Sequence, residues 1–382
     1  MHSIAIIHTQ YGPYHLARAH ALTNVFPGSV DLIQLAAKEN QRQWIVEENS
    51  LKISTIAPGV LESYSKKQLI NGLIYHLKQN SPSALVVAGY SEPAMRAAIL
   101  WGKKRNIPVI LLSDSQLCDR PRNFLVESIK GNWVRKNCSA AFVAGASAAQ
   151  YLDRLGFPKH KIWRGYDVVD NTHFTQMSEA VRRRKNNERQ RLNLPVNYLL
   201  YVGRLAPEKN LSRLLDALSL CQRSHVSKSL PLVIVGSGEQ EQELRQKAQN
   251  LGLKDIVWVG FKQIDQLPTY YALASALILP SISEPWGLVI NEAMACGLPV
   301  LASSNCGAVL DLVFPGVNGF VFDPFDCRSI SCGITSYFEL SEEQQNSMGV
   351  ASRQLIQNFT PELWARVLSD CVIQTSRLEG CQ

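Results

Sequence analysis

Short apolar runs alternate with longer amphipathic segments along almost the whole chain, and this rhythm constrains the fold more than any other feature. An apolar run followed by a helix-length amphipathic segment is typical of strand–helix units around a parallel sheet. The runs predicted as strands are 4–8, 30–35, 84–88, 109–112 and 140–144 in the first half and 198–202, 232–235, 256–259, 276–279 and 300–302 in the second. We therefore expect an α/β protein with two doubly wound, Rossmann-like sheets.

A charged segment separates the two halves. Residues 178–195, SEAVRRRKNNERQRLNLP, are rich in charge and amide groups and poor in large apolar side chains, which indicates an exposed connector with a solvated helix. We predict a first domain over 1–175, a linker over 176–195 and a second domain over 196–360. A helix over about 361–378 follows, and its packing back onto the first domain is left open. The two domains are expected to face each other across a ligand-binding cleft.

The net charge of +7 is carried by the first half, since residues 1–175 hold 20 Lys and Arg against 12 Asp and Glu, a balance of +8. A basic half can attract anionic lipid or a phosphorylated acceptor, but such a balance is also common on inert surfaces. We expect no nucleic-acid partner. No apolar run reaches the roughly 18 residues that cross a bilayer, so we expect a cytoplasmic protein, with peripheral contact to the inner membrane face through the first domain left open.

Glycines and cations follow the predicted strands of the second half. The run 198–202 ends at Gly203 and is followed by Arg204 and Lys209, just before a helical pattern. A guanidinium fork and an ammonium beside a helix N-terminus favour phosphate, although a pair of solvated loop cations has the same pattern. After the next two runs, Gly236 and Gly238 would let a ligand approach the backbone, and Phe261 would offer a ring beside a planar base.

The segment SEPWGLVINEAMACG places two carboxylates around an expected helix start. We predict that a helix opens at Gly287 or Leu288 and ends at Cys296. Amides at Gly287, Leu288 and Val289 then suit a pyrophosphate. Glu292, one turn further, would repel phosphate and suits ribose hydroxyls instead, and Glu284 suits a sugar hydroxyl. Ordinary loop and helix acids are the alternative for both.

On these residues the second half resembles glycosyltransferase family 4, a group of retaining enzymes with the GT-B fold. The resemblance rests on VGRLAPEKN, VIVGSGEQ, PSISEPWGLVINEAMACGLPVLAS with its E-x7-E spacing, and GVNGFVFDP. It implies that Arg204 and Lys209 hold the donor diphosphate together with the helix-start amides. It also implies that Glu292 binds the nucleotide ribose and that Glu284 binds the transferred sugar.

The first half resembles the family more loosely. The glycine pair of the family's first loop is reduced to Gly12, which we keep as a donor-side candidate. Many members carry a His after the strand at 109–112, where this chain has Ser-Asp-Ser. Asp114 is therefore our catalytic candidate on the acceptor side, with His15 as the second choice. A strand-end cap and a surface His are equally compatible with these two residues.

The resemblance implies a retaining glycosyltransferase of the hexosyltransferase type, with a role in polysaccharide biosynthesis. It would move a sugar from a nucleotide-diphosphate sugar, a UDP-sugar by preference, to a hydroxyl of a glycan, lipid or small molecule. The donor is a co-substrate, and neither a cofactor nor a metal is expected, because cations and a helix end neutralise the leaving diphosphate. The nine cysteines are scattered and form no CxxC pair. An epimerase or phosphorylase on the same fold, or a non-catalytic binding subunit, are the alternatives.

Overall fold

The structure is a computed structural model that describes residues 3–40, 51–223 and 230–380. It contains two compact α/β units. The first unit consists of the described residues up to Leu117, of Pro121–Val169 and of the segment from Phe359 onward. The second consists of Cys118–Arg120 and Asp170–Asn358. Among the described residues, no helix combines the length and the apolar character needed to span a bilayer.

The first unit is built on a parallel sheet with the strand order β3-β2-β1-β4-β5-β6-β7. The strands are β1 (Ser3–His8), β2 (Ser29–Lys38), β3 (Ile53–Val60), β4 (Ala84–Ala88), β5 (Val109–Ser113), β6 (Ala140–Val143) and β7 (Ile162–Arg164). The helices are α1 (Pro13–Val25), α2 (Lys66–Asn80), α3 (Pro93–Lys104), α4 (Phe124–Asn137), α5 (Ala146–Arg154) and α15 (Pro361–Gly380). The central strands are buried on both faces, which explains their continuous apolar runs.

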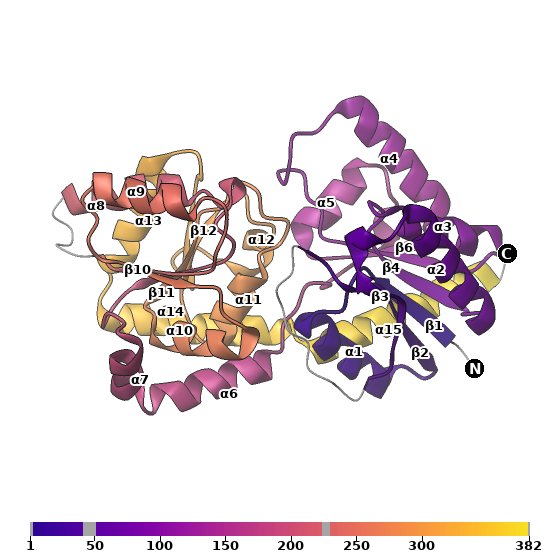
Figure 1. Cartoon of the computed structure of the whole chain (residues 1–382), viewed down its shortest axis with the longest axis horizontal. Coiled ribbons are helices and arrows are strands. Elements are labelled where there is room, and N and C mark those ends of the chain that lie inside the picture. The colour runs from indigo at the N-terminus through magenta and orange to yellow at the C-terminus, as the bar shows by residue number, and fades with distance from the viewer. Residues whose placement is uncertain (1–2, 41–50, 224–229, 381–382) are drawn as a thin grey trace. The chain divides into compact units, whose positions relative to one another are not determined.

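The second unit repeats this plan, with a parallel sheet in the order β10-β9-β8-β11-β12-β13. Its strands are β8 (Leu199–Val202), β9 (Leu232–Val235), β10 (Ile256–Gly260), β11 (Ala276–Leu279), β12 (Val300–Ser303) and β13 (Gly319–Phe322). Its helices are α6 (Asn171–Arg182), α7 (Lys185–Leu192), α8 (Leu211–Arg223), α9 (Glu241–Asn250), α10 (Leu267–Leu273), α11 (Leu288–Ala295), α12 (Val309–Leu312), α13 (Cys327–Phe338) and α14 (Glu342–Leu355). In Figure 1, α8, α9 and α13 cover one face of this sheet and α10 and α11 the other.

All ten predicted strands form, with ends shifted by at most three residues. The structure adds β3, β7 and β13, which the sequence analysis did not predict. Each of these three strands lies at the edge of its sheet. β3 and β7 are partly exposed and lack the uninterrupted apolar run that marks a central strand. β10 also lies at an edge, but it keeps an apolar run, IVWVG, and was predicted.

The chain passes from the first unit to the second between Val169 and Asp170, slightly before the predicted boundary. The segment 176–195, predicted as a connector with a solvated helix, contains the second half of α6 and all of α7. Phe174 and Val181 of α6 are buried, and this helix packs against α10 and α11. Arg183, Arg184 and Lys185 of the segment are exposed, whereas Arg182 points inward and donates to the Cys296 carbonyl.

The last helix returns to the first unit. Figure 1 shows α15, in yellow, beside α1, and the two helices are in extensive contact. Trp364, Leu368 and Cys371 of α15 are buried in the same apolar cluster as Phe142 of β6 and Leu22 of α1. The C-terminal segment is therefore part of the core of the first unit.

Candidate functional site

The candidate donor residues lie on two loops that leave neighbouring strands. The strand order of the second sheet reverses between β8 and β11, so the loops that follow these strands diverge to opposite faces. Open α/β sheets bind ligands at such a switch point. The loop after β8 carries Gly203, Arg204 and Lys209, and the loop after β11 carries Glu284 and Gly287.

Lys209 and Glu284 meet at this switch point. The Lys209 ammonium donates a hydrogen bond to Glu284 Oε2 at 2.5 Å. Both side chains are largely buried, with exposed fractions of 15% and 12%. Ser281 Oγ donates to the same carboxylate oxygen at 3.2 Å. The structure thus brings together a cation and a carboxylate that lie 75 residues apart in the sequence.

Backbone contacts hold both residues in place. Asn210, in the left-handed conformation at φ 61°, donates from its side-chain amide to the carbonyls of Pro280 and Pro324 at 3.0 and 2.8 Å. This anchors the turn that ends in Lys209 onto the loop after β11. The Glu284 carbonyl accepts from the Gly307 amide at 3.0 Å, which ties that loop to the next one. Sequence reasoning missed Asn210, although its place directly after a cation at a helix start is a signal.

Arg204 points elsewhere. Its guanidinium pairs with Glu208 at 2.6 Å and its side chain is 62% exposed. Its backbone is fixed because the Tyr201 hydroxyl donates to the Arg204 carbonyl at 2.7 Å. The Arg204 side chain therefore lies at the loop surface, in contrast to the packed Lys209.

The helix predicted after the apolar run is confirmed. Gly287 is the N-cap residue of α11 at φ 99°, the helix runs over Leu288–Ala295, and Gly297 follows in the left-handed conformation at φ 72°. A Cβ on Gly287 would lie 3.2 Å from Glu284 Cγ. The first amides of α11 have no carbonyl partner within the helix, so its N-terminus is suited to an anion directly beside Glu284.

Glu292 lies inside the domain. It is on the second turn of α11 with an exposed fraction of 1%, and its carboxylate accepts a hydrogen bond from the Tyr271 hydroxyl at 2.7 Å. Tyr271, on α10, is itself fully buried and was missed from the sequence. The tyrosine fixes the direction of a carboxylate that the sequence analysis treated as an accessible group.

The glycines after β8 and β9 pack against each other. A Cβ on Gly236 would lie 1.9 Å from the Gly203 carbonyl oxygen, and a Cβ on Gly238 would lie 2.4 Å from the Leu205 carbonyl oxygen. Here these glycines let the backbone after β9 pack closely against the backbone after β8. Phe261 follows β10 and is 37% exposed, as expected for a ring at the domain surface.

In the first unit, Gly12 and His15 belong to one capping arrangement. The Gly12 amide donates to His15 Nδ1 at 2.9 Å at the start of α1. The His15 ring also lies 4.3 Å from the ring of His8, which ends β1. The structure therefore gives His15 a local role in shaping the loop after β1, next to the switch point of the first sheet.

Asp114 follows β5 and lies in the electrostatic environment of a buried ion pair. Arg18 of α1 and Asp167 are both buried, with 3.4 Å between Arg18 Nη1 and Asp167 Oδ1. Burial raises the pKa of Asp167 to about 7, Arg18 opposes this shift, and the charge of Asp114 adds to it. Sequence reasoning missed Arg18, and the signal was an arginine within an otherwise apolar helix face.

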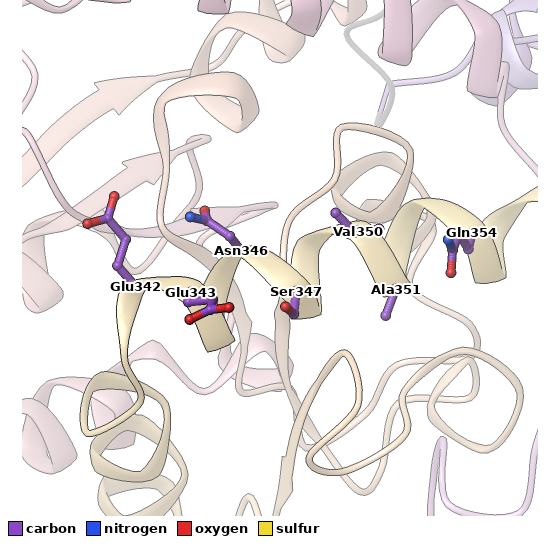
Figure 2. Close-up of a pocket in the computed structure, with 7 residues that line it drawn as sticks. All are labelled: Glu342, Glu343, Asn346, Ser347, Val350, Ala351 and Gln354. Carbon is purple, nitrogen blue, oxygen red and sulfur yellow. The ribbon is translucent and has the colours of Figure 1, made fainter.

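A separate hollow of about 540 Å³ lies along α14. Figure 2 shows that its seven labelled residues all come from this helix, with Glu342 at one end and Gln354 at the other. None of the candidate donor residues lines it. The candidate site is therefore defined by the contacts around Lys209 and Glu284.

The second unit is similar to a known family of enzymes. Residues 182–355 match the family model "Glycosyl transferases group 1". An uncharacterized glycosyltransferase of Methanocaldococcus jannaschii is 36% identical over 137 residues, which cover 36% of this chain and 34% of that protein. The chain thus matches about a third of the length of that curated relative. The predicted enzyme class, a glycosyltransferase, agrees with the family model and with the name of this relative.

Solved structures confirm the GT-B fold over the whole chain. The sucrose-phosphate synthase of Thermosynechococcus elongatus superposes with a TM-score of 0.78 at 19% identity, covering 100% of both chains. The Anabaena protein HepE, in complex with UDP, superposes with a TM-score of 0.75 at 17% identity, covering 98% of this chain and 100% of HepE. The prediction of two Rossmann-like domains is correct.

Proposed function

We propose that the protein is a retaining glycosyltransferase that transfers a sugar from a nucleotide-diphosphate sugar to a hydroxyl acceptor. The observation that carries this proposal is the contact of Lys209 with Glu284 beside the N-terminus of α11. A cation and helix amides suit the diphosphate, and an adjacent carboxylate suits the hydroxyls of the sugar. The group 1 match of this unit supports the same reaction class.

Lys209 and Glu284 form a preformed pair that the donor would divide. Without donor, each neutralises the other in a largely buried position. A donor diphosphate offers the Lys209 ammonium a doubly charged partner, and the sugar offers Glu284 hydroxyl donors in exchange. The pair thus holds both side chains in a binding geometry before the substrate arrives, which lowers the entropic cost of binding.

In the transfer step, the bond between the sugar's anomeric carbon and the diphosphate oxygen breaks as the acceptor oxygen bonds to the same face of that carbon. The acceptor proton passes to the departing phosphate oxygen, so no separate general base is needed. Lys209, the α11 amides and the exposed side chain of Arg204 stabilise the negative charge that develops on the diphosphate. Glu292, oriented by Tyr271, is the proposed ribose contact.

UDP is the proposed nucleotide, because the fold relative HepE was crystallised with UDP, with UDP and glucose, and with UDP-glucose. The acceptor is a glycan, a lipid or a small molecule, with Asp114 as its proposed contact. We propose that the reaction needs no metal, because the protein itself supplies the cations that face the diphosphate.

The direct test is to incubate the full chain with radiolabelled UDP-, GDP- and ADP-sugars, with and without acceptor mixtures. We expect slow hydrolysis or transfer with UDP-sugars. NMR of the product should show that the anomeric configuration of the sugar is retained. Inversion at a ring carbon would identify an epimerase. Binding of UDP-sugars without turnover under all conditions would identify a binding subunit and overturn the proposal.

Tyr271→Phe tests the role of Glu292. Removing the hydroxyl leaves the buried carboxylate short of a donor, and we expect a loss of about 1 to 2 kcal/mol of unfolding free energy. If Glu292 holds the ribose, UDP affinity also falls by about tenfold, measured by calorimetry.

Tyr337→Phe is the matched control for this variant. Tyr337 is a buried tyrosine of the same unit whose hydroxyl donates to the Ser275 carbonyl at 2.7 Å. We expect a similar stability loss in this control with unchanged UDP affinity. Equal affinity losses in both variants would show that Tyr271 acts through stability alone.

A further inference from the structure

The first two turns of α4 expose large apolar side chains. Phe124 is 84% exposed, Leu125 70%, Val126 47% and Ile129 71%. Four such residues within one short segment form apolar surface that soluble monomers seldom leave in water. The buried positions of α4 come only in its later turns, and in Figure 1 the helix lies at the outer margin of the first unit.

The outer face of α4 changes from apolar to basic along its length. Leu125 and Ile129 lie one turn apart on one stripe, and the same stripe continues through Asn132 to the exposed Lys136. Glu127 lies on the opposite face, where it contacts Lys130 at 2.8 Å. The helix therefore presents an apolar start and a cationic end on the same side.

The surrounding segment is positively charged. Residues 117–137 contain five Lys and Arg and two acids. Both acids face cations, since Glu127 lies 2.8 Å from Lys130 and Asp119 lies 3.8 Å from Arg120. The net charge of this segment is therefore positive, and it is complementary to an anionic surface.

We propose that the start of α4 is a docking surface for an anionic lipid bilayer. Phe124, Leu125 and Ile129 enter the boundary between headgroups and acyl chains, and Lys136 stays among the anionic headgroups. Burial of apolar area and attraction of cations to the lipid charge act together in such binding. A protein partner fits less well, because interfaces between proteins are depleted in lysine. The proposal goes beyond the transfer reaction and needs no residue of the donor site.

The test is sedimentation of the full chain with vesicles of phosphatidylcholine alone or with about 30% phosphatidylglycerol, at about 0.15 M and about 0.5 M salt. We expect binding to the anionic vesicles only, and weaker binding at high salt. Leu125→Gln with Ile129→Gln should lower the partition coefficient by at least about tenfold. Lys136→Gln should lower it by about fivefold.

Val350→Gln is the matched control, because Val350 is 58% exposed on α14 and no part of this surface. It should bind as the unchanged protein does, and all variants should keep the melting temperature. Failure of the unchanged protein to bind anionic vesicles overturns the proposal, as does equal binding of the double variant. Self-association that the double variant abolishes, without vesicle binding, would assign the surface to a second copy of the chain. Should the double variant fail to fold, an unchanged partition of Lys136→Gln overturns the proposal.

Discussion

Lys209→Ala is expected to lower turnover by about 100- to 1,000-fold, which corresponds to about 3 to 4 kcal/mol of transition-state stabilisation. The ammonium lies at the switch point beside the start of α11, where charge would develop on the leaving diphosphate. Its removal also leaves Glu284 without its ion-pair partner in a largely buried position. We expect that loss to reduce the unfolding free energy by about 1 to 2 kcal/mol. Steady-state kinetics and thermal denaturation of the same preparation separate the two effects.

Lys247→Ala is the matched control for this prediction. Lys247 donates to Asp216 at 2.6 Å in the same unit, between α9 and α8, and plays no part in the candidate site. The control should keep its turnover and lose little stability, because its partner is more exposed. If Lys209→Ala lost activity only in proportion to its melting temperature, its proposed contact with phosphate would be wrong.

Gly236→Ala is expected to disrupt the second unit, with a loss of about 4 kcal/mol of unfolding free energy from overlap and backbone strain together. The added Cβ would lie 1.9 Å from the Gly203 carbonyl oxygen, and the residue has φ 145°. The Gly203 backbone cannot move aside in the way that the end of a flexible side chain can. Hydrogen exchange with mass spectrometry checks this separately in each unit, and peptides of β9 should lose protection while those of β5 keep it.

Gly252→Ala supplies the comparison. Gly252 also has a positive φ, 71°, in the same unit, but a Cβ there would meet nothing within 4 Å. This variant should lose only about 1 kcal/mol, the cost of the left-handed conformation alone. Similar losses in the two variants would mean that the loop after β8 moves aside and that the backbone contact is not rigid.

The central strands of both sheets were predictable because burial on both faces leaves a continuous apolar run. The edge strands β3 and β7 were not, since β3 reads ISTIAPGV and β7 only IWR, and both are partly exposed. The edge strand β10 was predicted, because its residues IVWVG form an apolar run. The helix α11 was predicted from its flanking glycines, and the structure agrees at both ends. A strand or helix can thus be predicted from its own residues where its burial or its flanking glycines leave a pattern in the sequence.

Contacts between distant residues were harder to predict. Lys209 and Glu284 were each singled out, yet their pairing across 75 residues depends on the strand order. Asn210 and Tyr271 were missed because their roles consist entirely of bonds to other elements. Gly236 was predicted to admit a ligand, and the structure shows that it admits the backbone of Gly203.

The return of α15 to the first unit separates the order of synthesis from the order of folding. A ribosome delivers Asp170–Asn358 before the segment that carries Trp364 and Leu368. At about 5–20 residues per second, the apolar face of α1 waits roughly 10 to 40 s for the helix that covers it. The unit made first is thus completed last, and during that interval the nascent chain lacks the helix that covers the apolar face of α1.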